Sequence, residues 1–418
     1  MSRQSVVLVT FDSMRVDHCG FAGYGRDTTP TLDTMAKEGL CFENAIAPGP
    51  STPEAMPIIL TGSHPRSLSG GIETDFLRRQ RALREHMGAR ETLAERFSRA
   101  GYATAGFSPN PYTSQYFGFD VGFDHYEDFV DGSRERLYDG MLDGVLDDLD
   151  LQGLFPARVL LNWLQREEVF KPWEAFYDAI VEWVQGVEEP YFLWVLLMDT
   201  HDPYLVPSEY RTQSRRATYH ANWRLWRQGH EPPFTEETHD RLVRAYDDTI
   251  RYSDAFVERL LGDLDGEPLV AVHGDHGEAF GEHGTYGHQQ RLYEENIHVP
   301  LVVSGGPDRT IEEPFSLADV PDLLWDLATG REPDVDGEPA RARTLGGTRL
   351  AARGHDWKYL RGPDGNAAYD LAADAEEQDP LNGAALHDVG KALVDRWVED
   401  DRERHRVDGA IEQVEKKL

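Results

Sequence analysis

The chain has 418 residues, and its 42 basic and 75 acidic side chains give a net charge of -33. This charge argues against electrostatic binding to nucleic acid or to an anionic membrane surface, and no run approaches the ~20 apolar residues of a membrane span. The two cysteines, Cys19 and Cys41, are too few for a disulfide framework.

The N-terminus and the composition indicate where the protein works. The apolar run "SVVLVTF" begins at residue 5, and no charged, apolar and small-residue pattern of a secretory signal precedes it. A chain this acidic, with only six lysines but many aromatic residues, is typical of a folded protein adapted to high salt. We therefore expect a halophilic, cytoplasmic protein.

Apolar runs and helical patterns alternate along the first three hundred residues. Buried strands are predicted at 5–11 (SVVLVTF), 191–198 (YFLWVLLM) and 268–274 (PLVAVHG). These runs lack period-two alternation, as expected when helices cover both faces of a parallel sheet. Helices are predicted at 30–40, 91–102 and 241–264. This alternation predicts an α/β sandwich with a large, mainly parallel sheet.

The pattern changes in three other regions. We predict a large α/β domain over 1–343 and a small C-terminal subdomain over 344–418, where short strands surround the turn signal "GPDG" and a charged helix follows. Residues 131–190 are helical, acidic and rich in Trp and Phe, which predicts an insertion that covers or flanks the active face. The polar segment 211–237 is a candidate lid.

Candidate reactive groups come directly after the predicted strands or at a helix start. Asp12 follows the first strand, at the edge where α/β sheets bind ligands. Ser51 and Thr52 precede Pro53, where a helix is expected to begin. Either hydroxyl is an N-cap or a nucleophile. As a nucleophile it needs a metal or a base, because a free hydroxyl has a pKa far above neutral.

The segment "VHGDHGEAFGEHGTYGH" supplies candidate metal ligands. Asp275 and His276 follow the strand at 268–274, at the same sheet edge as Asp12. Together with an alkoxide of Thr52 they would give mixed oxygen and nitrogen coordination. That donor set suits one divalent ion, Mn, Mg, Ca or Zn, better than copper.

Five further histidines divide into two groups. His201, after the strand at 191–198, and His288 are candidates to contact a substrate oxygen or to protonate a leaving group. His273, His283 and His298 lack such a placement, and we expect structural or supporting roles for them.

Three blocks of the chain are similar to known hallmark sequences. Residues 8–65, containing "LVTFD" and "STPEAMPIILTG", resemble the N-terminal block of the sulfatase family, within the alkaline phosphatase superfamily. "GDHGEAFGEHGTYGHQQRLYEENIHVPLVV" resembles its second block, and "WKYLRGPDGNAAYDLAADAEEQDPLN" its C-terminal hairpin. The resemblance implies an αβα sandwich with a large, mainly parallel mixed sheet and a small C-terminal α+β domain with an antiparallel sheet.

The resemblance also implies roles for residues that match the family motifs. Asp12, Asp275 and His276 match metal ligands, and Thr52, counted back from "LTG", matches the nucleophile. His201 and His288 match the groups that surround the transferred oxyanion. Ser51 remains the rival nucleophile, because its distance to Pro53 fits the family spacing.

The departures from the family pattern bear on the substrate. Sulfatases carry Cys or Ser, followed by x-Pro-x-Arg, and oxidise that residue to formylglycine, whereas Thr52 is followed by "PEAM". Ser13 stands where the family has a second Asp, and His276 where it often has Asn. This pattern is similar to that of Thr-nucleophile phosphotransferases, phosphodiesterases and phosphonate hydrolases.

Two kinds of function follow. The first is a metal-dependent hydrolase or transferase that acts on a sulfate or phosphate ester of a small molecule, glycan or lipid headgroup, through a covalent intermediate on Thr52. The second is an inactive, sulfatase-like binding protein, suggested by the missing Cys/Ser-x-Pro-x-Arg signature.

Overall fold

The structure is a computed structural model of residues 1–418, and it describes residues 3–65, 76–129, 171–335, 337–381 and 385–415. Its centre is an eight-stranded sheet with the order β10-β2-β9-β6-β1-β5-β3-β4. The strands of this sheet are β1 (Val6–Phe11), β2 (Leu40–Ile46), β3 (Ala103–Phe107), β4 (His125–Glu127), β5 (Tyr191–Leu197), β6 (Leu269–Gly274), β9 (His298–Ser304) and β10 (Arg309–Ser316).

The sheet is mixed but mainly parallel, as predicted. β9 runs antiparallel to its neighbours β2 and β6, and every other neighbouring pair is parallel. The three predicted strands correspond to β1, β5 and β6. These strands are neighbours at the centre of the sheet and are buried along their whole length. Alternate side chains of each strand lie in two separate hydrophobic cores, one on each face of the sheet. In β1, Val6 and Leu8 lie in one core and Val7 and Val9 in the other. Burial on both faces explains the uninterrupted apolar runs.

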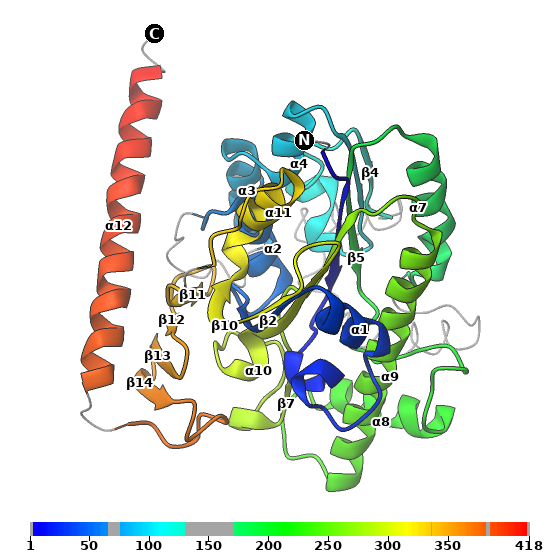
Figure 1. Ribbon diagram of the computed structural model, residues 1–418. Helices are drawn as coiled ribbons and strands as arrows, with labels where there is room; N and C mark the ends of the chain where they lie inside the picture. The colour runs from blue at the N-terminus through cyan, green and yellow to red at the C-terminus, as the bar shows by residue number, and fades with distance from the viewer. Residues whose placement is uncertain (1–2, 66–75, 130–170, 336, 382–384, 416–418) are drawn as a thin grey trace.

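Helices cover both faces of the sheet (Figure 1). One core contains side chains of α2 (Thr52–Thr61), α3 (Phe76–Ala89), α4 (Leu93–Arg99) and α11 (Val320–Ala328). The other contains side chains of α1 (Pro30–Glu38), α7 (Glu174–Gly186), α8 (Arg215–Arg227) and α9 (Glu236–Asp263). The predicted αβα sandwich is therefore confirmed. Among the described helices, none has the length and apolar content of a membrane span.

Several short elements connect these layers. They are α10 (Glu294–Ile297), the hairpin strands β7 (Ala279–Phe280) and β8 (Tyr286–Gly287), and the 3-10 helices Val16–His18, Gly20–Ala22, Pro111–Thr113, Gln115–Phe117, Glu282–Gly284 and Leu317–Asp319.

The C-terminal end of the predicted insertion over 131–190 contains the helix α7, and the insertion itself stays a prediction. Within α7, Phe176, Tyr177 and Ile180 are buried in the core that also contains side chains of α1, α8 and α9. Their spacing places them on one side of the helix, so α7 packs into the sandwich layer. The remainder, 131–170, lies outside the described residues.

A second sheet follows the sandwich. Its four strands, β11 (Ala340–Arg343), β12 (Leu350–Arg353), β13 (Trp357–Gly362) and β14 (Gly365–Asp370), are antiparallel in that order. The "GPDG" turn joins β13 to β14, as predicted. The long helix α12 (Ala385–Glu415) lies on the same side of the molecule (Figure 1) and packs Val394 and Trp397 onto this sheet. β11 begins before the predicted boundary at 344, and the division into two domains stays a prediction.

A buried ion cluster joins the second sheet to the sandwich. Lys358 of β13 is fully buried, and its Nζ lies 3.0 Å from Oε1 of Glu294 and 3.1 Å from Oε1 of Glu377. Burial raises the pKa of Glu377 to about 7, although the charge of Lys358 opposes this shift. The ammonium thus lies between two carboxylates, and Arg353 adds a second positive charge 3.3 Å from Oε2 of Glu294.

We expect Lys358→Met to destabilise the protein by about 3–5 kcal/mol, because the buried Glu377 loses its counter-ion and Glu294 keeps only Arg353. Equilibrium unfolding in urea at neutral pH measures this loss. Lys391→Met is the matched control, since Lys391 forms an exposed pair with Asp395, and its unfolding midpoint should stay close to that of the unmodified protein. A loss for Lys358→Met as small as the control's would contradict the assigned role.

Candidate active site at the carboxyl edge of the sheet

Four adjacent parallel strands bring polar side chains to one edge of the sheet. β6, β1, β5 and β3 are neighbours, so their carboxyl ends meet there. Asp12 directly follows β1, Asp275 directly follows β6, and His201 comes shortly after β5. Asn110 comes shortly after β3. The structure thus brings together residues that are far apart in sequence.

Asp12, Asp275 and His276 form a buried group of potential metal ligands. Each offers a ligand atom, and these atoms all lie within 4.8 Å of one another. Nε2 of His276 is 3.4 Å from Oδ1 of Asp12 and 3.7 Å from Oδ1 of Asp275. Oδ1 of Asp275 accepts hydrogen bonds from the backbone N–H groups of Ser13 and His276. Its Oδ2 is buried and accepts none from the described residues.

This donor set fits a divalent cation. Two carboxylates are buried side by side with one imidazole, and a buried carboxylate oxygen lacks a donor. Such an arrangement is costly without a positive charge. A hard cation that takes oxygen and imidazole ligands would supply that charge.

Burial and the charges of neighbouring residues shift the pKa values of Asp12, Asp275 and His276. Burial raises the pKa of the Asp275 carboxyl to about 7, with the charge of Asp12 adding to the shift and His276 opposing it. Burial opposes protonation of His276, but the charge of Asp275 and the hydrogen bond with Asp12 outweigh it and raise the pKa to about 10. For Asp12, burial is outweighed by His276 and by the charges of His201 and His288, which lower its pKa.

Thr52 is the first residue of α2 and faces the metal-ligand group. Its Oγ1 donates to Oδ2 of Asp12 over 3.2 Å and lies 3.4 Å from Nε2 of His276. Ser51 is the N-cap residue of the same helix, and its hydroxyl instead donates to the buried carboxylate of Glu54 over 3.1 Å. The two candidate hydroxyls therefore point to different partners.

Asn110 is a site residue that the sequence reasoning missed. Its Nδ2 donates to Oδ2 of Asp12 over 2.6 Å and to Oγ1 of Thr52 over 3.3 Å. The available signal was its position after a short strand, at the same edge as Asp12. Ser13, in the left-handed region at φ 62°, donates its hydroxyl to Oδ1 of Asp12 over 3.0 Å. Both side chains orient the Asp12 carboxylate.

His201 and His288 lie above this buried group. Their ring centroids are 4.9 Å apart, and the His288 ring is 4.7 Å from that of His276. Nδ1 of His288 lies 3.3 Å from Oε2 of Glu278, a fully buried carboxylate whose Oε1 accepts no hydrogen bond from the described residues. The two imidazoles thus lie next to each other and beside the metal-ligand group.

The remaining histidines of the hallmark segment have structural partners. His273 is fully buried, and its Nε2 lies 2.9 Å from Oγ1 of Thr10. His283 stacks on Tyr293 with ring centroids 3.5 Å apart, and its Nδ1 lies 2.9 Å from Glu295. His298 begins β9, and its Nε2 lies 2.8 Å from the carbonyl oxygen of Glu43. None of these contacts involves Thr52 or Asp12.

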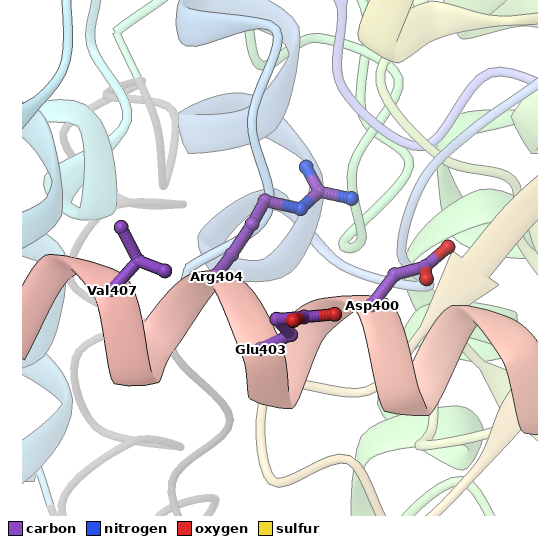
Figure 2. Close-up of a pocket in the computed structure, with 4 residues that line it drawn as sticks. All are labelled: Asp400, Glu403, Arg404 and Val407. Carbon is purple, nitrogen blue, oxygen red and sulfur yellow. The ribbon is translucent and has the colours of Figure 1, made fainter.

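A cavity of about 420 Å³ lies elsewhere, on α12 (Figure 2). Its lining residues are spaced by three and four positions, so they share one side of the helix: Asp400, Glu403, Arg404 and Val407. It contains no residue of the sheet edge, and we do not assign the candidate site to it.

Comparison with known proteins agrees with this geometry. The family model described as Sulfatase matches residues 4–330. The chain belongs to the sulfatase family. This assignment places it among the hydrolases of ester bonds, in a superfamily whose members use a divalent metal.

Known members of the sulfatase family and of the same fold are distant in sequence. An arylsulfatase of Clostridium perfringens is 36% identical over 107 residues, which cover 24% of this chain and 20% of that protein. An ulvan-active sulfatase of Formosa agariphila is 22% identical, over 81% of this chain and 64% of its own length. The matched region thus spans less than two thirds of either relative.

A solved structure shows the same fold over nearly the whole chain. The phosphonate monoester hydrolase of Agrobacterium radiobacter has a TM-score of 0.64 and 17% identity, and the match covers 96% of each chain. At this identity the likeness concerns the fold alone, and it confirms the alkaline phosphatase-like architecture.

Proposed function

We propose that the protein is a metal-dependent hydrolase that cleaves a phosphate or phosphonate ester through a covalent intermediate on Thr52. The observation that carries this proposal is the position of the Thr52 hydroxyl. It lies at the N-terminus of α2, within 3.2 Å of Asp12 and 3.4 Å of His276. A helix N-terminus stabilises an anion, so the transferred group would bind there with its negative oxygens toward the helix.

The chain's own residues supply the remaining functions. When bound by Asp12, Asp275 and His276, the cation would lower the pKa of the Thr52 hydroxyl and polarise the group under attack. The Thr52 oxygen gives its proton to solvent as it forms a bond to phosphorus, while the bond from phosphorus to the leaving oxygen breaks, and it takes a proton back when it is released. A water molecule then attacks phosphorus and releases Thr52, so that the net reaction is hydrolysis.

His201 is suited to give a proton to the leaving oxygen. Burial disfavours its charged form, but the negative charges of Asp12 and Asp202 outweigh this and raise its pKa above the ordinary value. An imidazole held beside the Asp202 carboxylate is suited to general acid catalysis. His288, held by Glu278, is placed to donate to an oxygen of the transferred group.

The nucleophile favours phosphorus over sulfur. The resemblance to sulfatases implies a formylglycine made from Cys or Ser, and Thr52 cannot be converted by that route. An unmodified hydroxyl resembles instead the nucleophile of the phosphotransferases and phosphonate hydrolases of the superfamily. Sulfate ester hydrolysis is the second candidate, because the family model and both curated relatives are sulfatases. The ester's organic part would be a small molecule, a glycan or a lipid headgroup.

The test is a panel of 4-nitrophenyl phosphate, bis-4-nitrophenyl phosphate, 4-nitrophenyl phenylphosphonate and 4-nitrophenyl sulfate. Each is assayed with Mn, Mg, Ca or Zn, at low and high KCl because of the predicted salt adaptation. We expect turnover of a phosphorus ester that exceeds turnover of the sulfate. Faster turnover of the sulfate would favour the second candidate. No turnover in any condition would favour a binding protein without activity.

A further inference from the structure

A carboxylate and a third histidine lie beside the catalytic groups assigned above. Asp202 follows His201 in sequence and is the partner of two imidazoles. Its Oδ1 lies 3.2 Å from Nδ1 of His201, and its Oδ2 lies 3.1 Å from Nε2 of His230. Oδ2 is thus hydrogen-bonded to His230, and Oδ1 lies at ion-pair distance from His201. Among the described residues, this is a carboxylate shared by two histidines at the opening of the site.

His230 belongs to the polar segment 211–237. It contacts the β7–β8 hairpin through its backbone and its ring. Its backbone carbonyl accepts a hydrogen bond from the N–H of Tyr286 over 3.2 Å. Its ring packs against Gly287, where a Cβ would lie 3.3 Å from Cδ2 of His230. Gly287 has a φ of 86°, which favours glycine as well. The segment is thereby joined to the β7–β8 hairpin beside His288.

The exposure of these residues places them at the entrance. Side chains of Asp202, His201 and His230 are 22%, 20% and 27% exposed, whereas those of the metal-ligand group are at most 1% exposed. An ester whose phosphorus reaches Thr52 would therefore have its leaving group near these imidazoles.

The hydrogen bonds of His201 fix which nitrogen faces the substrate. Nδ1 lies 2.6 Å from the backbone carbonyl oxygen of Asp202, in addition to its contact with the carboxylate. Nδ1 therefore carries a donated hydrogen, and Nε2 is the nitrogen that exchanges a proton with substrate. Loss of His230 would leave Oδ2 of Asp202 without this partner, and the carboxylate could rotate away from His201.

We propose that Asp202 and His230 are positioning residues that hold His201 with Nε2 toward the leaving-group oxygen. This inference rests on the proposed ester hydrolysis. As the bond from phosphorus to the leaving oxygen breaks, that oxygen takes the proton of Nε2. His201 regains a proton from the water molecule that hydrolyses the intermediate, so its protonation state is restored at the end of each turnover.

The test compares two esters in Asp202→Asn and His230→Gln. Protonation matters most for a weakly acidic leaving group, so phenyl phosphate is compared with 4-nitrophenyl phosphate, or the same pair of phosphonates if those are the better substrates. General acid catalysis contributes about 10²–10⁴-fold. We expect kcat/KM for the phenyl ester to fall by about 10²-fold, and that for the 4-nitrophenyl ester by less than about threefold. Circular dichroism and thermal melting verify that each variant is folded.

His125→Gln is the matched control, because the His125 imidazole pairs with Glu127 at 3.1 Å on the edge strand β4. It should change neither ester's turnover. An equal loss for both esters in the two variants, or no loss for either, would overturn the positioning role while the proposed function stands. An unmodified protein that hydrolyses neither ester class would overturn both.

Discussion

Thr52→Ala is expected to lower the turnover of the preferred ester by at least about 10³-fold, as removal of a nucleophile does in other covalent hydrolases. The reason is geometric, because the Thr52 hydroxyl donates to Asp12 over 3.2 Å and also lies 3.4 Å from Nε2 of His276. Steady-state kinetics with the metal that supports the highest rate measure this loss. Thr52→Ser keeps a hydroxyl at the same helix end and should keep more activity than Thr52→Ala.

Ser51→Ala separates the two neighbouring hydroxyls. Ser51 donates to Glu54, away from the metal-ligand group, so its loss should leave turnover within a few-fold of the unmodified protein. Mass spectrometry of the acid-quenched reaction should find the transferred group on Thr52. Preserved activity in Thr52→Ala together with a large loss in Ser51→Ala would assign the nucleophile to Ser51 instead.

The central fold could be predicted because its strands are buried on both faces. β1, β5 and β6 appear in the sequence as apolar runs without alternation, and the structure buries all their residues. The same property reveals Asp12 and Asp275, since a carboxylate that ends such a run lies at the edge where parallel strands finish. Helix α7 was harder to place, because a helical pattern does not say which side of the sheet it covers.

Contacts between separate segments could not be predicted in this way. His230 is 28 positions from Asp202 and lies just beyond the C-terminal end of α8, outside the helical period. Asn110 follows a strand of five residues, ATAGF, whose small residues give a weak strand signal. Both side chains are brought to the site by packing of the chain around them. The sequence therefore indicated the residues that end the strong strands and missed those that orient them.

Metal binding is expected to release protons, and the number released should depend on pH. Below about pH 10 a metal-free His276 is protonated, and below about pH 7 Asp275 is protonated as well. A cation must displace these protons, because only neutral imidazole and ionised carboxylate are ligands. We therefore expect metal binding to release about one proton per site at pH 8 and about two at pH 6.

The affinity for the metal should therefore rise with pH. Each displaced proton makes the association constant about tenfold larger per unit rise in pH, so affinity should climb steeply up to pH 7 and more gently above it. Isothermal titration calorimetry in buffers of different ionisation enthalpy counts the released protons. Equal proton release at pH 6 and pH 8 would contradict the assignment of the raised pKa to Asp275.

Asp275→Asn is the variant that isolates this carboxyl. The amide keeps the shape of the side chain and its contact with the backbone N–H groups of Ser13 and His276, but it cannot be ionised. The second proton should therefore disappear at pH 6, and affinity should fall at every pH. In the unmodified protein, a metal concentration of 100 times Kd should add about 2.7 kcal/mol of stability. A chelator should remove that increment, and the melting temperature of Asp275→Asn should respond far less to either addition. A cation that stabilised both proteins equally would have to bind elsewhere than between Asp12, Asp275 and His276.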